Sequence, residues 1–324
     1  MIPDLAGVLA SAVPFALPLR VPFRGVTRRV GLLLPGPAGW GEFAPFPDYP
    51  PRLAARWLAA GLEAAYTGWP APVRASVGVN AIVPDVPAEE IARSIPPGAR
   101  TVKVKVTGRL SADLERVAAV RAAAGPAAAL RLDANGGWTL DDAIGALPAL
   151  QEAAGAIEYV EQPLPDLADM QRLREAVGIP IAVDESLRLA PDPFDPALLS
   201  TVRAVADVAV LKVAPLGGVA ATMRLARLLG MPAVVSSALD TSIGLSAGVA
   251  AACALADPPL DCGLGTAALF ADDVVVPPLA PGDGRLSAMR VRPDPDALSR
   301  AAAAIEPEAE ASLRDRLAEA WRYR

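Results

Sequence analysis

The 324-residue chain contains no histidine. This absence excludes every mechanism that requires a histidine base, a histidine metal ligand or a Ser-His-Asp triad. Any acid–base chemistry that the chain performs must therefore use lysine, tyrosine, cysteine or carboxylate side chains.

Cysteine and excess positive charge are also scarce. The two cysteines, Cys253 and Cys262, form no metal-binding or redox motif, so we expect reduced thiols in the core. The 30 basic residues are outnumbered by 36 acidic ones, which gives a net charge of −6 and a pI near 4.9. This balance argues against nucleic acid as a partner, because a polyanion is bound by clustered positive charge.

Long hydrophobic runs are missing as well. No apolar stretch approaches the length needed to span a membrane. An apolar run near the N-terminus, residues 8–19, is interrupted by one serine and two prolines, and no lysine or arginine precedes Arg20. Since a signal peptide has a basic region before its apolar segment, we expect no signal peptide, no membrane partner and a cytoplasmic location.

What the sequence does contain is a series of short apolar strands that end in charged side chains. These side chains are Lys105, Asp133, Glu161, Asp184 and Lys212. The successive separations are 28, 28, 23 and 28 residues, about the length of one parallel strand–helix–strand repeat. In a closed parallel barrel the carboxyl ends of the strands converge on one face, and that face carries the chemistry.

The two ends of the chain depart from this rhythm. Residues 1–85 predict two strands, at 26–34 and from 39 onward, followed by a helix at 51–66, which is an α+β unit. Beyond the barrel, a proline-rich segment precedes an alanine-rich helical region at 297–324. The length of 324 residues suits one barrel of roughly 250 residues plus a smaller unit.

The three acids at the strand ends favour a divalent cation. Asp133, Glu161 and Asp184 offer hard oxygen ligands without sulfur or imidazole, which suits Mg²⁺, or alternatively Mn²⁺, better than Zn²⁺. A single acid at such a position more often caps a helix or pairs with a lysine. Three on consecutive strands, flanked by lysines, make the metal site the better hypothesis.

The lysines supply the matching base. Lys103 and Lys105 lie on one face of their strand because strand side chains alternate, and Lys212 ends a later strand. Crowding by a cation and by one another is expected to lower their pKa values towards neutrality. A lysine base beside carboxylate-held Mg²⁺ can remove a proton α to a carboxylate, so we expect a small-molecule carboxylate substrate.

Five motifs now carry a resemblance to a known family. They are Lys103-Val-Lys105, Asp133-Ala-Asn135, Glu161-Gln-Pro163, Asp184-Glu-Ser186 and Leu211-Lys-Val213. Together they resemble the muconate-lactonizing-enzyme subgroup of the enolase superfamily. Within that subgroup the chain is most similar to the actinobacterial o-succinylbenzoate synthases, and the supporting stretches are residues 22–25, 39–42, 236–242 and 263–266, together with Arg131.

The resemblance covers essentially the whole chain and implies a fold. It implies a modified (β/α)₇β TIM barrel at residues 86–285, covered by an α+β capping domain built from residues 1–85 and 286–324. Phe23, Arg24 and Gly25 would lie on a loop that faces the barrel mouth. Asp133, Glu161 and Asp184 would bind Mg²⁺.

The resemblance also implies an activity. Lys105 would abstract the α-proton of 2-succinyl-6-hydroxy-2,4-cyclohexadiene-1-carboxylate and then protonate the departing hydroxyl, which gives o-succinylbenzoate for menaquinone biosynthesis. Lys212 would act as a cation on the opposite face, and Lys103 would tune Lys105. The expected substrate contacts are Arg131, Asn135, Ser236, Ser237 and Gly263.

Alternatives remain on the same scaffold. An N-succinylamino acid racemase or a dipeptide epimerase would use Lys105 and Lys212 as opposed bases, although the epimerases resemble chains with Asp-x-Asp where this chain has Gly263-Leu264-Gly265. Muconate cycloisomerisation is less favoured by residues 23–25. A non-catalytic binding protein would not retain all three acids and both lysines. The sequence shows no interface, so a monomer is the default expectation.

Overall fold

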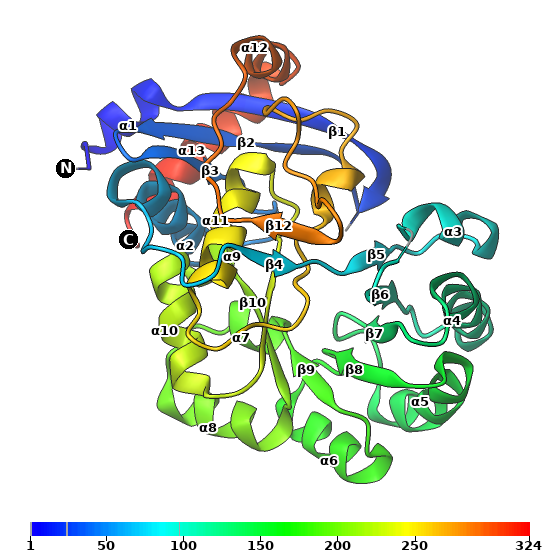
Figure 1. Cartoon of the computed structure of the whole chain (residues 1–324). Coiled ribbons are helices and arrows are strands. Elements are labelled where there is room, and N and C mark those ends of the chain that lie inside the picture. Colours follow the sequence, from blue (N-terminus) through cyan, green and yellow to red (C-terminus); the bar gives the residue numbers. More distant parts are fainter. Residues whose placement is uncertain (1, 24, 97) are drawn as a thin grey trace.

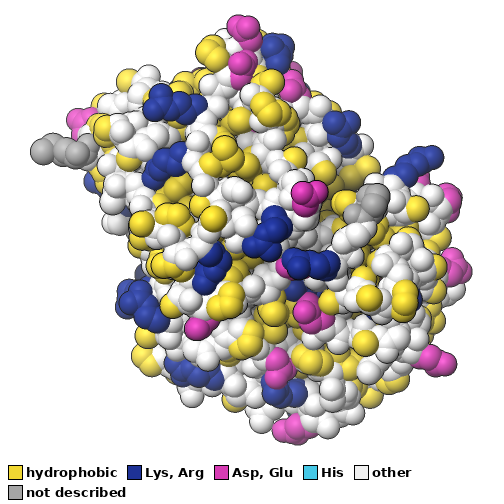
Figure 2. All heavy atoms as spheres, in the orientation of Figure 1, with side chains coloured by type: hydrophobic (Ala, Val, Ile, Leu, Met, Phe, Trp, Pro, Cys, Tyr) yellow, Lys and Arg dark blue, Asp and Glu magenta, His cyan; other side chains and the backbone are white. Residues whose placement is uncertain are grey.

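The computed structural model describes residues 2–23, 25–96 and 98–324. A curled parallel sheet with helices on its outer side forms one half of the molecule, and a small antiparallel sheet with its own helices covers the other half (Figure 1). Acidic and basic side chains alternate over the face shown in Figure 2, with hydrophobic atoms between them.

The parallel sheet has seven strands in the order β11-β10-β9-β8-β7-β6-β5. Their bounds are β5 Ala81–Val83, β6 Thr101–Lys105, β7 Ala129–Asp133, β8 Ile157–Glu161, β9 Ile181–Val183, β10 Val208–Lys212 and β11 Ala233–Ser236. Chain order and spatial order agree throughout, as successive strand–helix repeats require. The predicted barrel class of fold is confirmed, and the five strands that end in charged side chains lie in consecutive positions.

Helices connect these strands, and the longer ones form the outer layer (Figure 1). They are η2 Ala88–Glu90, α3 Ile91–Ser94, α4 Leu110–Ala124, α5 Leu140–Ala154, α6 Leu167–Val177, α7 Glu185–Arg188, α8 Pro196–Val205, α9 Val213–Leu216, α10 Val219–Leu229, α11 Ser242–Ala254 and η3 Thr266–Leu269. Thr139 caps α5 by accepting from the Asp142 amide. Ser111 lies inside the first turn of α4 and does not cap it, because α4 already begins at Leu110.

The circle of strands is completed by single-residue pairings. Cys262 bridges Val79, and Gly263 bridges Ser236, both in parallel. These residues occupy the eighth position of the barrel. The extended segment at 76–83 is divided: β4 (Ser76–Gly78) pairs antiparallel with β12 (Arg285–Ser287), and only β5 joins the parallel sheet. Both cysteines lie in the described ranges, where they are buried free thiols, as expected.

The N-terminal region forms the antiparallel sheet β1 (Val13–Phe23), β2 (Val26–Gly36) and β3 (Gly39–Phe43). It is flanked by α1 (Leu5–Ser11), α2 (Pro51–Leu62) and the π-helical turn η1 (Glu63–Thr67). The apolar run at 8–19 is therefore the end of α1 and the start of β1. None of the helices in the described ranges is long and apolar enough to cross a membrane.

The C-terminal tail packs on this N-terminal region. It consists of α12 (Pro295–Ala303) and α13 (Pro307–Trp321), which contact β1 and α2 respectively. Leu313 and Leu317 of α13 share one apolar cluster with Phe15 and Trp57. The same cluster includes residues 238, 239, 243 and 270, which belong to the segment expected to form the barrel domain. The core of this half is therefore shared between the two expected domains. Their boundaries at residues 85 and 286 stay a prediction.

This shared core leads to a stability prediction. Leu317 is fully buried, so Leu317→Ala is expected to lower the free energy of unfolding by about 2–5 kcal/mol, because it removes buried methyl groups and leaves a cavity. Leu228→Ala is the control, since Leu228 on α10 is 39% exposed and should change stability far less. Urea unfolding of both variants measures the difference. Equal losses would show that α13 is not part of the folded core.

Candidate active site

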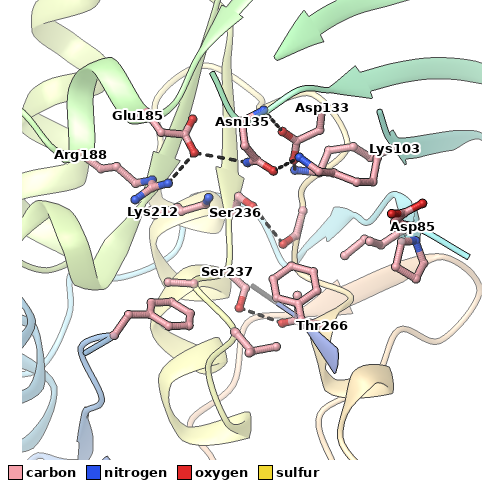
Figure 3. Close-up of a pocket in the computed structure, with 18 of the residues that line it drawn as sticks. Asp85, Lys103, Asp133, Asn135, Glu185, Arg188, Lys212, Ser236, Ser237 and Thr266 are labelled. Atoms are coloured by element: carbon pink, nitrogen blue, oxygen red, sulfur yellow. Dashed lines mark hydrogen bonds and ion pairs between the residues drawn. The ribbon is translucent and has the colours of Figure 1, made fainter. Parts of the chain in front are cut away.

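A cavity of about 580 Å³ lies at the carboxyl ends of the parallel strands. Charged side chains line one side of it, and Lys103, Asp133 and Lys212 among them come from the strands (Figure 3). The lining also includes apolar side chains such as Phe23, Phe46, Tyr49 and Leu239. Phe23 therefore faces the barrel mouth as expected, whereas Arg24 lies outside the described residues. A ligand with a charged end and an apolar body would match both walls.

The strand register places the expected charged residues side by side. Lys105 is paired with Asp133, and Asp133 with Glu161, across β6, β7 and β8. Asp184 follows β9, and Lys212 ends β10. The three carboxylates are buried at 8%, 1% and 0% exposure, although charged groups are rarely buried without partners.

Amines satisfy these carboxylates. The Nζ of Lys103 lies 2.8 Å from Asp133 Oδ2 and 3.2 Å from both carboxylate oxygens of Glu161. The Nζ of Lys212 lies 2.6 Å from Asp184 Oδ2. Within the described residues no three acids are already grouped to hold a metal ion. The three carboxylates nevertheless suit a divalent cation as ligands. They are buried at the ends of successive strands, and here lysine ammonium groups supply the positive charge that they need.

Burial and neighbouring charges shift the pKa values of these groups. Burial raises the pKa of Glu161 to about 7, and the charges of Asp133 and Asp184 add to this rise. Burial also disfavours the ionised form of Asp184, but Lys212 and Arg188 outweigh it and lower that pKa to about 2. Glu161 therefore takes up a proton more readily than Asp184 does.

The two lysines of β6 differ in the same way. Burial opposes the charge of Lys103, but Asp133 and Glu161 prevail and raise its pKa well above the usual value. Burial lowers the pKa of Lys105, the charge of Lys103 contributes to this, and Asp133 opposes it. The direction expected for Lys105 is found here through burial. Two carboxylates hold the Lys103 amine and raise its pKa, so the lowering expected beside a bound cation stays a prediction for Lys103.

Asn135 holds Lys105 in the cavity. The Lys105 amine donates to the Asn135 side-chain oxygen, and Asn135 Nδ2 donates to Glu185 Oε1 at 3.3 Å. The backbone of Asn135 is left-handed, with φ of 48°, and its amide donates to Asp133 Oδ1 at 3.1 Å. Asn135 is therefore placed to orient the amine, and it remains a proposed substrate contact.

Arg188 is a site residue that the sequence analysis missed. Its Nε donates to Asp184 Oδ1 at 3.0 Å, its Nη2 to Glu185 Oε1 at 2.5 Å, and its Nη1 to the Tyr49 hydroxyl. A hydrogen-bonded path thus runs from Lys105 through Asn135, Glu185, Arg188 and Asp184 to Lys212. Figure 3 shows its middle part, from Asn135 through Glu185 to Arg188. The spacing of four residues between Asp184 and Arg188 on one helical turn is the signal that could have revealed it.

Arg131 lies away from the cavity. Its side chain is completely buried inside the barrel, 4.9 Å from the ring centre of Tyr159. Its Nε donates to Glu158 Oε2 at 2.5 Å, and its Nη1 to Asn80 Oδ1 at 3.1 Å. Because Arg131 is absent from the described cavity lining, we revise its expected substrate contact to a place in the barrel interior.

Ser236, Ser237 and Gly263 do line the cavity, together with Thr266, which the sequence analysis passed over. The Ser236 hydroxyl donates to the Gly263 carbonyl at 3.3 Å, and the Ser237 hydroxyl to Asp240 Oδ2 at 3.0 Å. Thr266 Oγ1 donates to Ser237 Oγ at 2.7 Å. These hydroxyl protons are already used within the protein, so Ser236 offers a ligand an acceptor atom rather than a donor. The Ser237 oxygen also accepts from Thr266 Oγ1 and from the Asp240 amide, so Ser237 offers a ligand surface alone.

Comparison with known proteins places this site in a family. The Enolase C-terminal domain-like model matches residues 87–294, and the Enolase N-terminal domain-like model matches residues 14–65. The chain is 50% identical over 281 residues to an o-succinylbenzoate synthase of Thermobifida fusca, covering 86% of this chain and 87% of that protein. It is 49% identical over 312 residues to one of Mycolicibacterium smegmatis, covering 94% of each. The chain belongs to the o-succinylbenzoate synthase family of the enolase superfamily.

Solved structures share the fold of this synthase-family chain at lower identity. Muconate lactonizing enzyme from Pseudomonas fluorescens, complexed with muconolactone, superposes with a TM-score of 0.75 at 21% identity, covering 90% of this chain and 97% of that one. An N-succinyl Arg/Lys racemase from Bacillus cereus gives 0.73 at 19%, covering 90% and 96%. These two similarities establish the fold that the synthase family shares with its superfamily.

Proposed function

We propose that the chain catalyses the Mg²⁺-dependent dehydration of 2-succinyl-6-hydroxy-2,4-cyclohexadiene-1-carboxylate to o-succinylbenzoate, a carbon–oxygen lyase reaction. The observation that carries this proposal is the meeting of the Lys105 and Lys212 amines with Asp133 at one cavity, in a chain about 50% identical to curated synthases. Glu161 and Asp184 are buried beside this cavity, where they pair with Lys103 and Lys212. Lys105 ends β6 and Lys212 ends β10, four strand positions away, so the amines approach a bound ligand from opposite sides of the curled sheet.

Asp133, Glu161 and Asp184 are the residues that would hold the metal. Bound there, Mg²⁺ would supply positive charge that stabilises the substrate carboxylate while the α-proton is removed. Lys103 and Lys212, which neutralise these acids in the structure, would then be available to the anionic substrate. Mn²⁺ could serve the same donor set.

Lys105 performs both proton transfers in this proposal. Its neutral amine takes the proton from the carbon α to the carboxylate, and the resulting ammonium donates a proton to the hydroxyl that leaves from the same face. One carbon–hydrogen and one carbon–oxygen bond break, water departs, and the ring becomes aromatic. Burial lowers the pKa of Lys105, which increases the share of the neutral amine that the first step needs.

Lys212 contributes charge rather than proton transfer. Its amine lines the cavity opposite Lys105 and is held by Asp184, so it can face the substrate ring as a cation. The apolar wall around Phe46 and Leu239 suits the six-membered ring. We further propose a role in menaquinone biosynthesis, a cytoplasmic location and a monomeric state, with no nucleic-acid partner.

The same pair of opposed amines supports one second candidate, N-succinylamino acid racemisation, in which each lysine serves one face. Both reactions can be tested with one preparation. With Mg²⁺ present, we expect the cyclohexadiene to be converted to the aromatic product, and EDTA to stop the conversion. N-succinyl amino acids in D₂O report racemisation through exchange of the α-proton. Exchange without any dehydration would overturn the proposed function in favour of the second candidate.

A further inference from the structure

A buried glutamate of the N-terminal sheet reaches across to the barrel. Glu42 on β3 is 6% exposed, and its Oε2 accepts from the Thr241 amide at 3.1 Å, the Thr241 hydroxyl at 2.6 Å and the Gly244 amide at 3.1 Å. These donors belong to the first turn of α11. Glu42 therefore ties the N-terminal region to the helix that follows the last strand of the parallel sheet.

The segment joining β11 to α11, residues 236–241, forms one wall of the substrate cavity. Ser237 and Leu239 line it, and Ser237 is labelled in Figure 3. Leu239 has a φ of 63°, a conformation that is unfavourable for residues other than glycine and persists only where neighbours impose it. Arg29 of β2 donates to the Leu239 carbonyl at 2.9 Å, so a second residue of the N-terminal sheet holds the same segment.

Two glycines make the approach of Glu42 possible. A Cβ on Gly41 would lie 1.9 Å from the Gly61 carbonyl oxygen, so β3 can lie against α2 only without a side chain there. A Cβ on Gly244 would lie 2.8 Å from Glu42 Oε2. Burial and the charge of Asp240 raise the pKa of Glu42 to about 8, while the hydrogen bonds from Thr241 and Gly244 counteract the rise. The contact is thus a close and specific one.

We propose that Glu42 is a positioning residue, which fixes the cavity wall at residues 236–241 and thereby sets the affinity for the substrate more than the rate of proton transfer. The inference rests on the proposed function for its kinetic arm. Glu42 bonds to neither lysine and to none of the three acids among the interactions described, so its loss should displace the wall and leave Lys105 in place.

Glu63 provides a matched control. Its Oε2 accepts from the Val219 amide at 2.6 Å and its Oε1 from the Ala220 amide at 2.9 Å, so it bonds to the first turn of α10 as Glu42 does to α11. None of the described residues 213–229 lines the cavity. Loss of Glu63 therefore removes a similar junction between the two halves without touching the substrate wall.

The experiment compares Glu42→Ala, Glu42→Gln and Glu63→Ala in the full-length chain with Mg²⁺. Glu42→Ala leaves buried donors without an acceptor, and we expect KM for the cyclohexadiene to rise about 10- to 100-fold while kcat changes about threefold at most. Glu42→Gln keeps one acceptor oxygen and should recover much of the affinity. Glu63→Ala should leave KM unchanged. An equal rise in KM for Glu63→Ala, or a fall in kcat at constant KM for Glu42→Ala, would overturn the proposal.

Hydrogen exchange adds a measurement that needs no turnover. Amides of residues 238–244 should exchange faster in Glu42→Ala and in Gly244→Ala than in the wild type, whereas those of β6 should not. Unchanged exchange at 238–244 would refute the positioning role even if the dehydration assay works. If exchange at 238–244 is faster in the variants but the wild-type chain shows no dehydration, the positioning role of Glu42 is supported and the proposed function is refuted.

Discussion

Replacing Lys105 by alanine is expected to lower kcat for dehydration by about 10⁴-fold or more. One general acid–base step is worth roughly 10²–10⁴, and the proposal gives Lys105 both proton transfers. Asn135 would keep its bond to Glu185, so the surrounding cavity should survive the change. Product formation, followed by the absorbance of the aromatic ring, measures the effect.

Lys212→Arg is the matched variant on the opposite side of the cavity. Arginine keeps the charge and can still pair with Asp184, but its planar group differs in shape from an ammonium, and it is too weak an acid to exchange protons. We expect reduced but measurable dehydration and complete loss of any racemisation of N-succinyl amino acids, because racemisation needs a working base on each face. If Lys105→Ala dehydrated normally while Lys212→Arg did not, the base would be assigned to the wrong side.

Strand periodicity explains why the charged residues of the site could be predicted. Lys105, Asp133 and Glu161 follow one another at a constant spacing, and the structure pairs them in register. A repeat of strand and helix leaves little freedom in where each strand ends, so position along the chain converts directly into position around the barrel. Their roles as metal ligand or base remain predictions.

Depth along the strand explains the revision at Arg131. Alternation correctly turns Arg131 to the same side as Asp133, but two residues along a strand correspond to about 6.6 Å. Lys103 stands at the same level and still reaches the cavity, because its amine is drawn to Asp133 and Glu161. Arg131 instead bonds to Glu158, and the choice between the two directions depends on partners that no local pattern reveals.

Contacts between the two halves could not be predicted for the same reason. Tyr49 meets Arg188, and Glu42 meets Thr241, across 139 and 199 residues of sequence. No local sequence pattern marks any of these residues as a contact between the two halves. Glu42 reaches α11 through the packing of β3 on α2. The helical tail expected at 297–324 is found as two helices, and Pro307 begins the second of them.

Glu161→Gln is expected to abolish turnover while the fold is retained. Glutamine has nearly the shape of glutamate, but it removes a negative charge from the proposed metal ligands, and a neutral amide is a weaker partner for a hard cation. Lys103 keeps its 2.8 Å contact with Asp133, so the amine is not left unpaired. Turnover at saturating Mg²⁺, Mg²⁺ affinity by titration calorimetry and the thermal unfolding midpoint measure the three consequences.

Glu158→Gln is the control on the same strand. Glu158 pairs with Arg131 and lies three residues before Glu161, so its replacement removes an equal charge from β8 without touching the proposed ligands. We expect this variant to bind Mg²⁺ and to turn over, with any loss confined to stability. Wild-type activity in Glu161→Gln would remove Glu161 from the metal site. An equal loss in both variants would trace the effect to the total charge of the barrel interior, because only Glu161 lies beside Asp133 in the sheet.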